Sequence, residues 1–265
     1  MTTCKILHGD CLDLMRQMPD DSVDLVFCSP PYEAARTYGI GFDLKGEDWV
    51  AWAFERYTEC LRVSRGLVAW VVEGQTRQFR YTASPILLMA DLHRAGVKLR
   101  KPPIYKRVGI PGSGGPDWWR NDYEFCICAA GGRLPWSDNT ATGHEPKYKP
   151  GGKPTHRNAK GKRSGAAEYK PPAKANPGNV VECHGGGGHM GSRLAHENEA
   201  PFPEKLAEAF VLSFCPPGGT VLDCFSGSGT TAAVSVRNGR NAIAMDIRET
   251  QTELSQKRLA EGGAA

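Results

Sequence analysis

Residues 220–231 constrain the fold of this chain more than any other stretch. The apolar run at residues 220–224 predicts a buried strand, and the glycine-rich stretch from Phe225 to Gly229 predicts a tight turn. A helix is expected to start at Thr230, and a further apolar run ends at Asp246. Strand, glycine turn, helix, strand and acidic residue in this order are typical of an open α/β sheet that binds a ligand at the carboxyl ends of its strands.

The glycine turn suits a ligand that approaches the backbone closely. Gly227 and Gly229 carry no Cβ that would obstruct it. The helix amides near Thr230 and Thr231 can bind an anionic group such as a carboxylate. The turn lacks the Lys-Ser/Thr ending of a phosphate-binding loop, and three glycines at dinucleotide-fold spacing are missing. A glycine turn alone is a packing feature as often as a ligand site, so the prediction depends on the order of the elements.

A second informative stretch, Ser29-Pro30-Pro31-Tyr32, follows the apolar run at residues 23–27. Two consecutive prolines cannot continue a sheet ladder, because each fixes φ and removes a backbone donor. The predicted strand therefore ends in a stiff turn with a small hydroxyl, an unpaired carbonyl and an aromatic ring. Such a turn suits a flat substrate that bears an amino group, although an ordinary strand-terminating loop is an equal alternative for this stretch alone.

The rest of the chain alternates between strand and helix patterns. Strands are expected at residues 5–8, 23–27, 66–72, 97–106, 123–129, 220–224 and 241–245. Helices are expected at residues 11–18, 47–63, 84–94, 203–213 and 248–259, the third with Ser84 as N-cap and the last on the surface. This alternation predicts one α/β domain, with a mostly parallel sheet covered by helices on both faces.

Residues 131–199 have a different composition, in which Gly, Pro, Lys, Arg, Asn and His replace large apolar residues. Between residues 145 and 174, nine lysines and arginines stand against two glutamates, an excess of seven charges in a chain whose net charge is +4. A flexible basic segment with interleaved aromatics suits contact with phosphates, and a solvated insertion without a partner is the alternative. The candidate phosphate contacts are Lys147, Lys149, Lys153, Arg157, Lys160, Lys162 and Arg163.

Other features exclude several classes of protein. The nine cysteines lie mostly in apolar runs, which favours buried thiols in a reducing cytoplasm over a disulfide framework. No signal peptide is expected at the start of the sequence, and no apolar run reaches the length of a membrane span. The spacing of Cys183, His184 and His189 does not match a zinc site, so no metal is expected. The tryptophans Trp70, Trp118, Trp119 and Trp136 are expected to anchor core or loops.

The two motifs together resemble the amino-directed DNA methyltransferases that use S-adenosylmethionine. Asp223-x-Phe225-x-Gly227-x-Gly229-Thr230-Thr231 is similar to the cofactor motif of that family, and Ser29-Pro30-Pro31-Tyr32 to its catalytic motif. The catalytic motif comes first and a basic region lies between, which resembles the permuted beta class. Gly9-Asp10-Cys11 and the segment from His196 to Phe210 are also similar to that class. The resemblance covers residues 4–130 and 196–260, but not the insertion, where such enzymes vary and recognise their DNA sequence.

The resemblance implies a Rossmann-like methyltransferase fold with circularly permuted motifs: a catalytic half at 1–130, a DNA-recognition insertion at 131–199 and a cofactor-binding half at 200–265. It implies methyl transfer to the exocyclic amine of a base flipped out of double-stranded DNA. Ser29, Pro30, Pro31 and Tyr32 would be catalytic. The cofactor would be bound by Asp10, Phe202, Asp223, Phe225, Gly227, Gly229, Thr230, Thr231 and Asp246.

Ser29 favours N4 of cytosine over N6 of adenine, because serine at this position of the motif is associated mostly with cytosine in the family. A protein-glutamine methyltransferase and a non-catalytic DNA-binding module are alternatives from other classes. Motif order and the basic insertion count against the first, and the intact cofactor loop against the second. The resemblance indicates a bacterial or phage-encoded cytoplasmic protein of a restriction-modification system, bound to the nucleoid through DNA. It leaves open a homodimer and a cognate restriction endonuclease.

Overall fold

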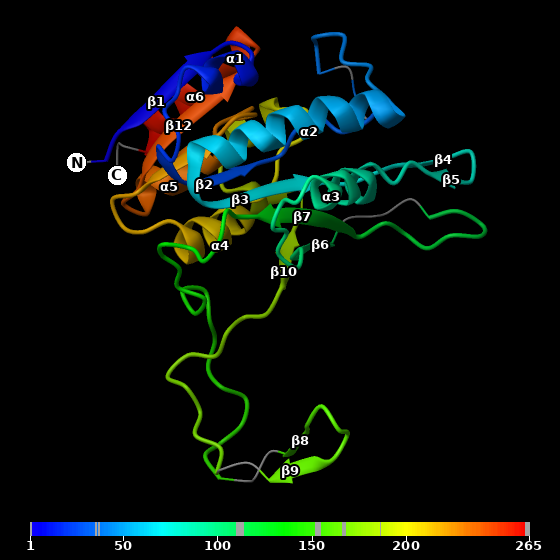
Figure 1. Ribbon diagram of the computed structural model, residues 1–265. Helices are drawn as coiled ribbons and strands as arrows, with labels where there is room; N and C mark the ends of the chain where they lie inside the picture. Colours follow the sequence, from blue (N-terminus) through cyan, green and yellow to red (C-terminus); the bar gives the residue numbers. More distant parts are fainter. Residues whose placement is uncertain are drawn as a thin grey trace.

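An eight-stranded sheet forms the centre of the protein in the computed structural model, which describes residues 2–34, 36, 38–109, 114–151, 155–165, 168–185 and 187–262. Its strand order is β1-β12-β11-β2-β3-β7-β6-β10 (Figure 1), and every neighbouring pair is parallel except those made by β7. The strands are β1 (Cys4–His8), β2 (Val23–Cys28), β3 (Ser64–Val72), β6 (Ile104–Val108), β7 (Tyr123–Ala129), β10 (Val180–His184), β11 (Thr220–Asp223) and β12 (Asn241–Asp246). The predicted α/β fold with a mostly parallel sheet is confirmed.

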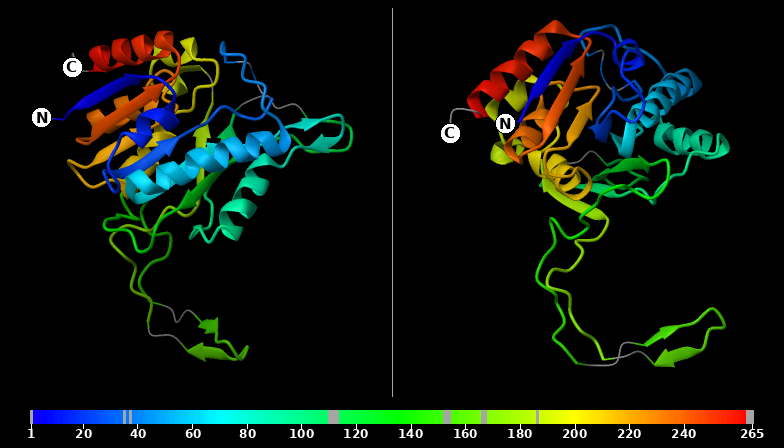
Figure 2. Two further views of the ribbon diagram at one scale, coloured as in Figure 1. Left: turned by 45° about the horizontal axis from the view of Figure 1, so that its top comes forward. Right: turned by 60° about the vertical axis from the view of Figure 1, so that its left-hand side comes forward.

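Helices cover both faces of this sheet (Figure 2). On one face lie α1 (Cys11–Arg16), α2 (Gly46–Val63) and α3 (Ser84–Arg94). On the other face lie α4 (Glu204–Phe214), α5 (Thr230–Arg237) and α6 (Glu249–Gly262). Alternate residues of a strand point to opposite faces, so a strand between two helix layers must be apolar throughout.

The central strand β2 shows why the chain folds in this way. Val26 and Cys28 pack in the core under α2, whereas Leu25 and Phe27 pack in the core under α4. All four side chains are fully buried. Burial of a side chain the size of Val, Leu or Phe stabilises the fold by about 1.5–3 kcal/mol relative to leaving it exposed. The strand is therefore held on both sides, and the turn that follows it emerges at a fixed place on the carboxyl edge of the sheet.

The parallel register brings the two ends of the sequence together at that edge. β11 pairs with β2 and with β12, and β12 pairs with β1. The carboxyl ends of these four strands are therefore neighbours, although β1 and β12 are more than 200 residues apart in sequence. The Ser-Pro-Pro-Tyr turn, the glycine turn and Asp10 follow these strand ends, and Asp246 is the last residue of β12.

Two expected local structures are wrong in detail. Ser84 is not the N-cap of α3: Ala83 holds that position at φ 57°, and the Ser84 hydroxyl instead donates a hydrogen bond to the carboxylate of Glu33. Residues 97–103 do not form a strand, since only Leu99 makes an isolated bridge and β6 begins at Ile104. Pro102 and Pro103 explain the delay, because neither has an N–H to donate to a ladder.

Two further expectations fail because burial was misjudged. The helix α6 is more than a surface helix, since Leu254, Ser255 and Arg258 are buried and the Ser255 hydroxyl donates to the carbonyl of Gly227. Trp119 is not a core anchor, because 96% of its surface is exposed, whereas Trp70 is fully buried as expected. Polar residues dominate the α6 sequence, and this hid its buried face.

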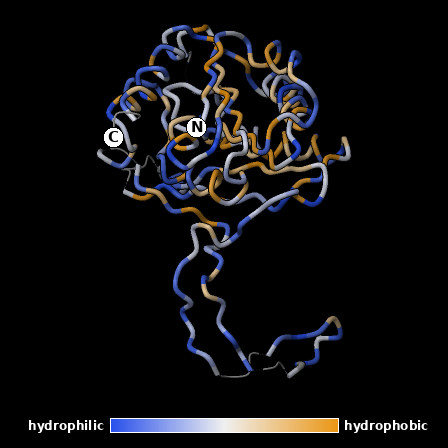
Figure 3. Tube along the Cα trace, turned by 90° about the vertical axis from the view of Figure 1, so that its left-hand side faces the viewer, coloured by the Kyte–Doolittle hydropathy of each residue, from blue (hydrophilic) through white to orange (hydrophobic). Residues whose placement is uncertain are grey.

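Between β7 and β10 the chain leaves the sheet as a long arm (Figure 1), which is largely hydrophilic (Figure 3). Its far end carries a hairpin of β8 (Thr155–Arg157) and β9 (Arg163–Gly165). Because β7 runs antiparallel to β3, the chain enters the arm heading away from the edge that carries Ser29. The arm returns at β10, a strand that the composition of residues 131–199 did not indicate. The division of the chain at residues 130 and 200 stays a prediction.

Cysteine burial agrees with the expectation of core thiols. All nine cysteines have free thiols, and all except Cys4 are buried. Cys28, Cys60 and Cys224 form one cluster, in which the Sγ atom of Cys224 lies 3.4 Å from that of Cys28 and 3.7 Å from that of Cys60. Among the residues that the structure describes, no helix is long and apolar enough to cross a membrane.

Candidate active site

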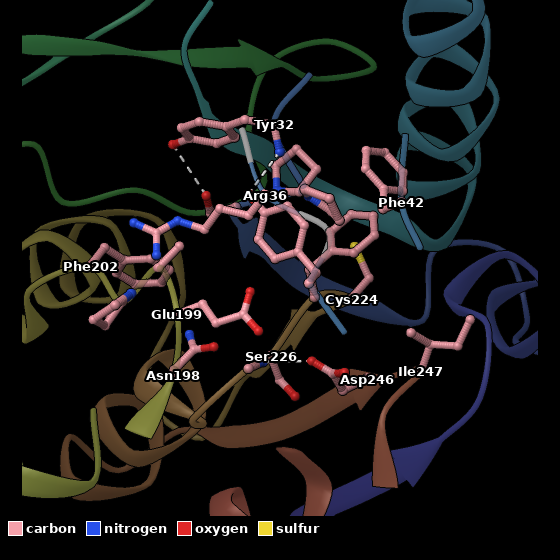
Figure 4. Close-up of a pocket in the computed structure, with 18 of the residues that line it drawn as sticks. Tyr32, Arg36, Phe42, Asn198, Glu199, Phe202, Cys224, Ser226, Asp246 and Ile247 are labelled. Atoms are coloured by element: carbon pink, nitrogen blue, oxygen red, sulfur yellow. Dashed lines mark hydrogen bonds between the residues drawn. The ribbon is translucent and has the colours of Figure 1, made fainter. Parts of the chain in front are cut away.

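A cavity of about 480 Å³ opens at the carboxyl edge of the sheet (Figure 4). It is bounded by the ends of β2, β11 and β12 together with the loop that follows Tyr32 and the segment before α4. Ten of the thirteen residues predicted for catalysis and cofactor binding line it: Asp10, Ser29, Pro30, Pro31, Tyr32, Phe202, Phe225, Gly227, Thr230 and Asp246. The cavity thus joins the two sequence motifs in one site.

Side chains hold the Ser-Pro-Pro-Tyr turn in place of ladder hydrogen bonds. The indole Nε1–H of Trp49 donates to the carbonyl of Pro31 at 2.9 Å, and the amide of Tyr32 donates to the hydroxyl of Tyr38 at 3.1 Å. The carbonyl of Pro30 accepts no hydrogen bond from the described residues. The turn therefore keeps one carbonyl available at the cavity while its neighbours are fixed.

A chain of hydrogen bonds connects Ser29 to the largely buried carboxylate of Glu124. The hydroxyl of Ser29 donates to the hydroxyl oxygen of Tyr32 at 3.3 Å, and the Tyr32 hydroxyl donates to Glu124 Oε2 at 2.6 Å. Arg107 Nη1 lies 3.5 Å from Glu124 Oε1. Because the single Ser29 hydrogen is used by Tyr32, the Ser29 oxygen is left to act as an acceptor toward the cavity.

Burial keeps the Tyr32 hydroxyl of this hydrogen-bond chain protonated. Burial, reinforced by the charge of Glu124, raises the pKa of Tyr32 well above its usual range. Burial also raises the pKa of Glu124, while the Tyr32 hydrogen bond and the charge of Arg107 oppose that rise. Tyr32 consequently keeps its proton at neutral pH and remains the donor to Glu124.

The glycine turn is shaped by close contacts on two sides. Gly227 has φ 50°, and its amide donates to Asp246 Oδ2 at 2.9 Å; a Cβ there would lie 2.6 Å from Asn198 Nδ2. Gly229 caps α5 at φ 75°, and its Cβ would lie 2.8 Å from Ser255 Oγ. Gly227 thus faces the cavity, whereas Gly229 is required for packing against α6.

Three predicted cofactor residues lie behind the cavity wall: Asp223, Gly229 and Thr231. Asp223 Oδ1 accepts a hydrogen bond from the amide of Phe225 at 3.1 Å, and its Oδ2 is buried without a partner among the described residues. Burial raises the pKa of Asp223 to about 7. The hydroxyl of Thr231 donates to the carbonyl of Phe27 at 3.4 Å. Direct contact of these three residues with a cofactor stays a prediction.

The acids Asp10 and Asp246 have defined orientations at the cavity. Asp10 caps α1 by accepting from the amide of Leu12 at 2.8 Å, and its Oδ2 lies 3.0 Å from Arg56 Nη2. Asp246 Oδ1 accepts from the amide of Arg248 at 2.9 Å. Each carboxylate oxygen has more than one lone pair, so both acids can still accept hydrogen bonds from hydroxyl groups of a ligand.

Several lining residues were missed by sequence reasoning. Glu124 lies in an otherwise apolar strand, and Arg56 lies on the buried face of α2 with its guanidinium 4.6 Å from the centroid of the Trp52 ring. A charged residue at a core position of a strand or helix was the available signal in both cases. Trp52 and Trp70 also flank Phe225, with ring centroids 5.7 and 5.5 Å away.

The predicted DNA contacts lie on the arm, away from the cavity. Lys147, Lys149, Arg157, Lys160, Lys162 and Arg163 are exposed, and Lys153 lies outside the described residues. Arg157 and Arg163 stand directly opposite each other in the β8–β9 pair. Like charges opposite each other destabilise a sheet, so this hairpin concentrates positive charge at a cost to its own stability.

The fold and the site define the class of the protein. A mostly parallel sheet whose carboxyl edge joins a Ser-Pro-Pro-Tyr turn to a glycine turn is the arrangement expected of an amino-methyltransferase. Residues 23–257 match the DNA methylase family, which methylates N4 of cytosine or N6 of adenine. The chain belongs to this family and is a DNA methyltransferase.

Individual relatives agree with this membership. The chain is 26% identical over 262 residues to the DNA adenine methyltransferase YhdJ of Escherichia coli, a match that covers 96% of this chain and 82% of YhdJ. The fold is similar to that of the cytosine-N4-specific PvuII DNA methyltransferase, with a TM-score of 0.70 and 19% identity, covering 97% of this chain and 87% of that one. It is also similar to TTHA0409 of Thermus thermophilus in its complex with S-adenosyl-L-methionine, with a TM-score of 0.63 and 22% identity, covering 99% and 96% of the two chains.

Proposed function

We propose that this protein transfers a methyl group from S-adenosylmethionine to N4 of a cytosine that has been flipped out of double-stranded DNA. The observation that carries the proposal is the orientation of the Ser29 hydroxyl. Its hydrogen is directed to Tyr32 and its oxygen is left as an acceptor in a cavity shared with the glycine turn.

An exocyclic amine needs activation because its lone pair is delocalised into the base. Two acceptors on the amino hydrogens draw the nitrogen toward tetrahedral geometry and localise that pair. The Ser29 oxygen supplies one such acceptor on a rigid turn, and the Pro30 carbonyl, which accepts no hydrogen bond from the described residues, supplies a second. Placement on a turn without backbone freedom also fixes the direction of attack, and positioning of this kind can supply a large part of a rate enhancement.

Tyr32 has two roles in this proposal. Its ring can stack on the flipped base and offset part of the unstacking cost, which is a few kcal/mol. Its hydroxyl orients Ser29 by accepting the serine hydrogen and donating its own to Glu124. Glu124 is therefore a positioning residue, which acts on the base through Tyr32 and Ser29.

The remaining walls of the cavity fit S-adenosylmethionine, which supplies an electrophilic methyl group when bound. Phe225 and Phe202 offer aromatic surface to a purine, and Asp246 and Asp10 offer acceptors for ribose hydroxyls or an amino group. Thr230, at the start of α5, faces the cavity where helix amides favour a carboxylate. The TTHA0409 complex supports this choice of cofactor.

The choice of cytosine rests on Ser29. Within this family a serine at this position is associated mostly with cytosine, and the PvuII enzyme, described as cytosine-N4-specific, supports that choice. N6 of adenine is the second candidate, because the relative YhdJ is an adenine methyltransferase. A homodimer and a partner restriction endonuclease stay predictions of the resemblance.

One experiment separates these outcomes. Unmethylated DNA is incubated with the protein and S-adenosylmethionine labelled in the methyl group, then digested to nucleosides and separated. Label in N4-methylcytosine is the expected result. Label in N6-methyladenine would replace cytosine by adenine as the target, and DNA without label would contradict methyl transfer to DNA as a whole.

A further inference from the structure

Two loops at the carboxyl edge carry large aromatic side chains that the fold leaves in solvent. Phe79 lies at the tip of the hairpin formed by β4 (Thr76–Arg77) and β5 (Arg80–Tyr81), and 71% of its surface is exposed. Trp119, in the loop between β6 and β7, is 96% exposed. The ring of Phe79 meets that of Trp118 edge to face, with centroids 5.5 Å apart, so the two loops lie side by side (Figure 1).

The hairpin tip is strained, although it gains no burial from its conformation. Gln78 and Phe79 both have positive φ, 48° and 62°, in a two-residue turn. Asn-Gly is the preferred pair for such a turn, and a bulky side chain in the left-handed region is a genuine outlier. Strain of this kind clusters at functional sites, so a partner outside the folded chain is the natural explanation for the exposed ring.

Both loops are attached to the wall of the cavity that contains Tyr32. Arg77 Nη2 donates to the carbonyl of Ala34, two residues beyond Tyr32, at 2.6 Å. Arg107 lines the cavity, and its amide and Nη2 donate to the carbonyls of Asp122 and Asn121, both at 2.7 Å. The two loops that carry the exposed aromatics are thus attached on the Tyr32 side of the cavity, the half that would receive the base, and not beside the glycine turn.

We propose that Phe79 and Trp119 form an aromatic wedge that contacts duplex DNA at the target base. The proposal rests on the function argued above. Once a base has left the helix, its neighbours lose their stacking partner, and an apolar ring inserted there restores stacking without reading sequence. Arg80 and Arg120 are exposed in the same two loops and can contact the flanking phosphates. The wedge is separate from the basic arm, which leaves the domain elsewhere.

Variants of the two rings test the wedge. Phe79→Ser, Trp119→Ser and the double variant are compared with Ile86→Ser, which changes an exposed apolar residue of α3 (47% exposed) outside both loops. The double variant is expected to lower kcat/KM on duplex DNA at least tenfold. The kcat/KM of Ile86→Ser is expected to equal that of the wild type. The affinity of every variant for S-adenosylmethionine, measured by calorimetry, is also expected to be unchanged. Wild-type activity of the double variant would overturn the proposal.

A second measurement follows Trp119 directly. Duplex DNA that the wild type methylates is expected to quench part of the tryptophan fluorescence, and Trp119→Phe is expected to lack that part. Equal quenching in both proteins would overturn the contact. Sedimentation without DNA tests whether the two rings instead bind a second copy of the chain. If the wild type is a dimer and the double variant a monomer, the rings form a dimer interface and the wedge is refuted. An inactive wild type would instead contradict the proposed function itself.

Discussion

At the scale of single residues, the site combines side chains that sequence motifs identify with others that only the fold brings in. Ser29 and Tyr32 were predicted, because two prolines between them indicate a stiff turn. Glu124 was not, because it is 92 residues from Tyr32 and β7 reaches the Ser-Pro-Pro-Tyr turn only through an antiparallel pairing with β3. Local patterns predict which residues sit at a strand end, whereas contacts between distant strands depend on sheet order.

The hydroxyl of Tyr32 is predicted to contribute separately from its ring. Tyr32→Phe keeps the ring and removes the link to Glu124, so kcat should fall about fivefold, the equivalent of one net hydrogen bond of about 1 kcal/mol. Ser29→Ala removes an acceptor from the amine itself and should cost about 100-fold or more. Single-turnover kinetics and calorimetry check this, with cofactor affinity expected to be unchanged. A Tyr32→Phe protein with the wild-type rate would contradict the orienting role of Glu124.

Asp223 is predicted to make stability depend on pH. Its pKa is about 7 in the folded protein and about 3.9 in an unfolded chain, so between these values the folded state holds a proton that the unfolded state has released. The free energy of unfolding therefore falls as pH rises through this window and levels off above pH 7. Asp223→Asn keeps an acceptor for the Phe225 amide without the charge. Between pH 5 and pH 8 the free energy of unfolding of the variant, measured in urea, should rise by up to ~3 kcal/mol relative to that of the wild type. Parallel pH profiles would contradict the prediction.

At the scale of elements, the sheet and most helices follow from apolar periodicity, and the failures have local causes. The strand expected at residues 97–106 begins only at Ile104, because Pro102 and Pro103 cannot donate hydrogen bonds to a ladder. The buried face of α6 is not evident from apolar periodicity because most of its buried residues are polar, and Ser255 and Arg258 donate hydrogen bonds to the glycine turn and to the start of α5. Arg258 is the clearest case: only 2% of its side chain is exposed, and it donates to Thr230 Oγ1 at 2.8 Å. Patterns of apolar residues cannot reveal a buried face built from hydrogen bonds.

Arg258 is predicted to hold the cofactor loop to α4 and α6. Its Nη2 lies 2.7 Å from Glu204 Oε1, and its Nη1 donates to the start of α5. Arg258→Met leaves a largely buried carboxylate without its inner partner, and breaking such a pair typically costs about 3–5 kcal/mol. Arg237→Met is the matched control, because Arg237 pairs with Glu204 Oε2 at 2.8 Å but is 52% exposed, where pairs are worth about 0–1 kcal/mol. Denaturant unfolding of both variants compares them, and equal losses would contradict a special role for Arg258.

At the scale of the whole molecule, the proposed function assigns the chemistry to one sheet edge and the nucleic acid to two separate regions. The composition of residues 131–199 predicted a basic insertion, and the structure gives its far end a hairpin with Arg157 opposite Arg163. No sequence pattern predicted that the chain would enter this arm heading away from the Ser-Pro-Pro-Tyr turn, since that direction follows from the antiparallel placement of β7. We therefore expect the arm to supply affinity at a distance from the cavity, and the site can be tested without it.

Removing the arm is predicted to separate DNA binding from folding. His144 and Ala175 already exchange both backbone hydrogen bonds, at 3.3 and 2.9 Å, so a short glycine linker can replace residues 145–174 without moving either end. The free energy of unfolding and the affinity for S-adenosylmethionine should stay as in the wild type. Affinity for duplex DNA should fall, and the slope of log K against log salt should become shallower by about 0.9 for each lost phosphate contact.

The control for that deletion keeps the arm and changes its charge alone. Arg157→Gln with Arg163→Gln removes the facing pair and should reduce the salt slope by up to about 2, while relieving the repulsion within the hairpin. If both variants bind DNA with the wild-type slope, the arm does not contact phosphates, and affinity must come from the loops around the cavity. If the deletion unfolds the protein but the double substitution only weakens DNA binding, the arm contributes to folding as well as to DNA affinity. The charges of the arm would then determine DNA affinity, and its backbone would determine stability.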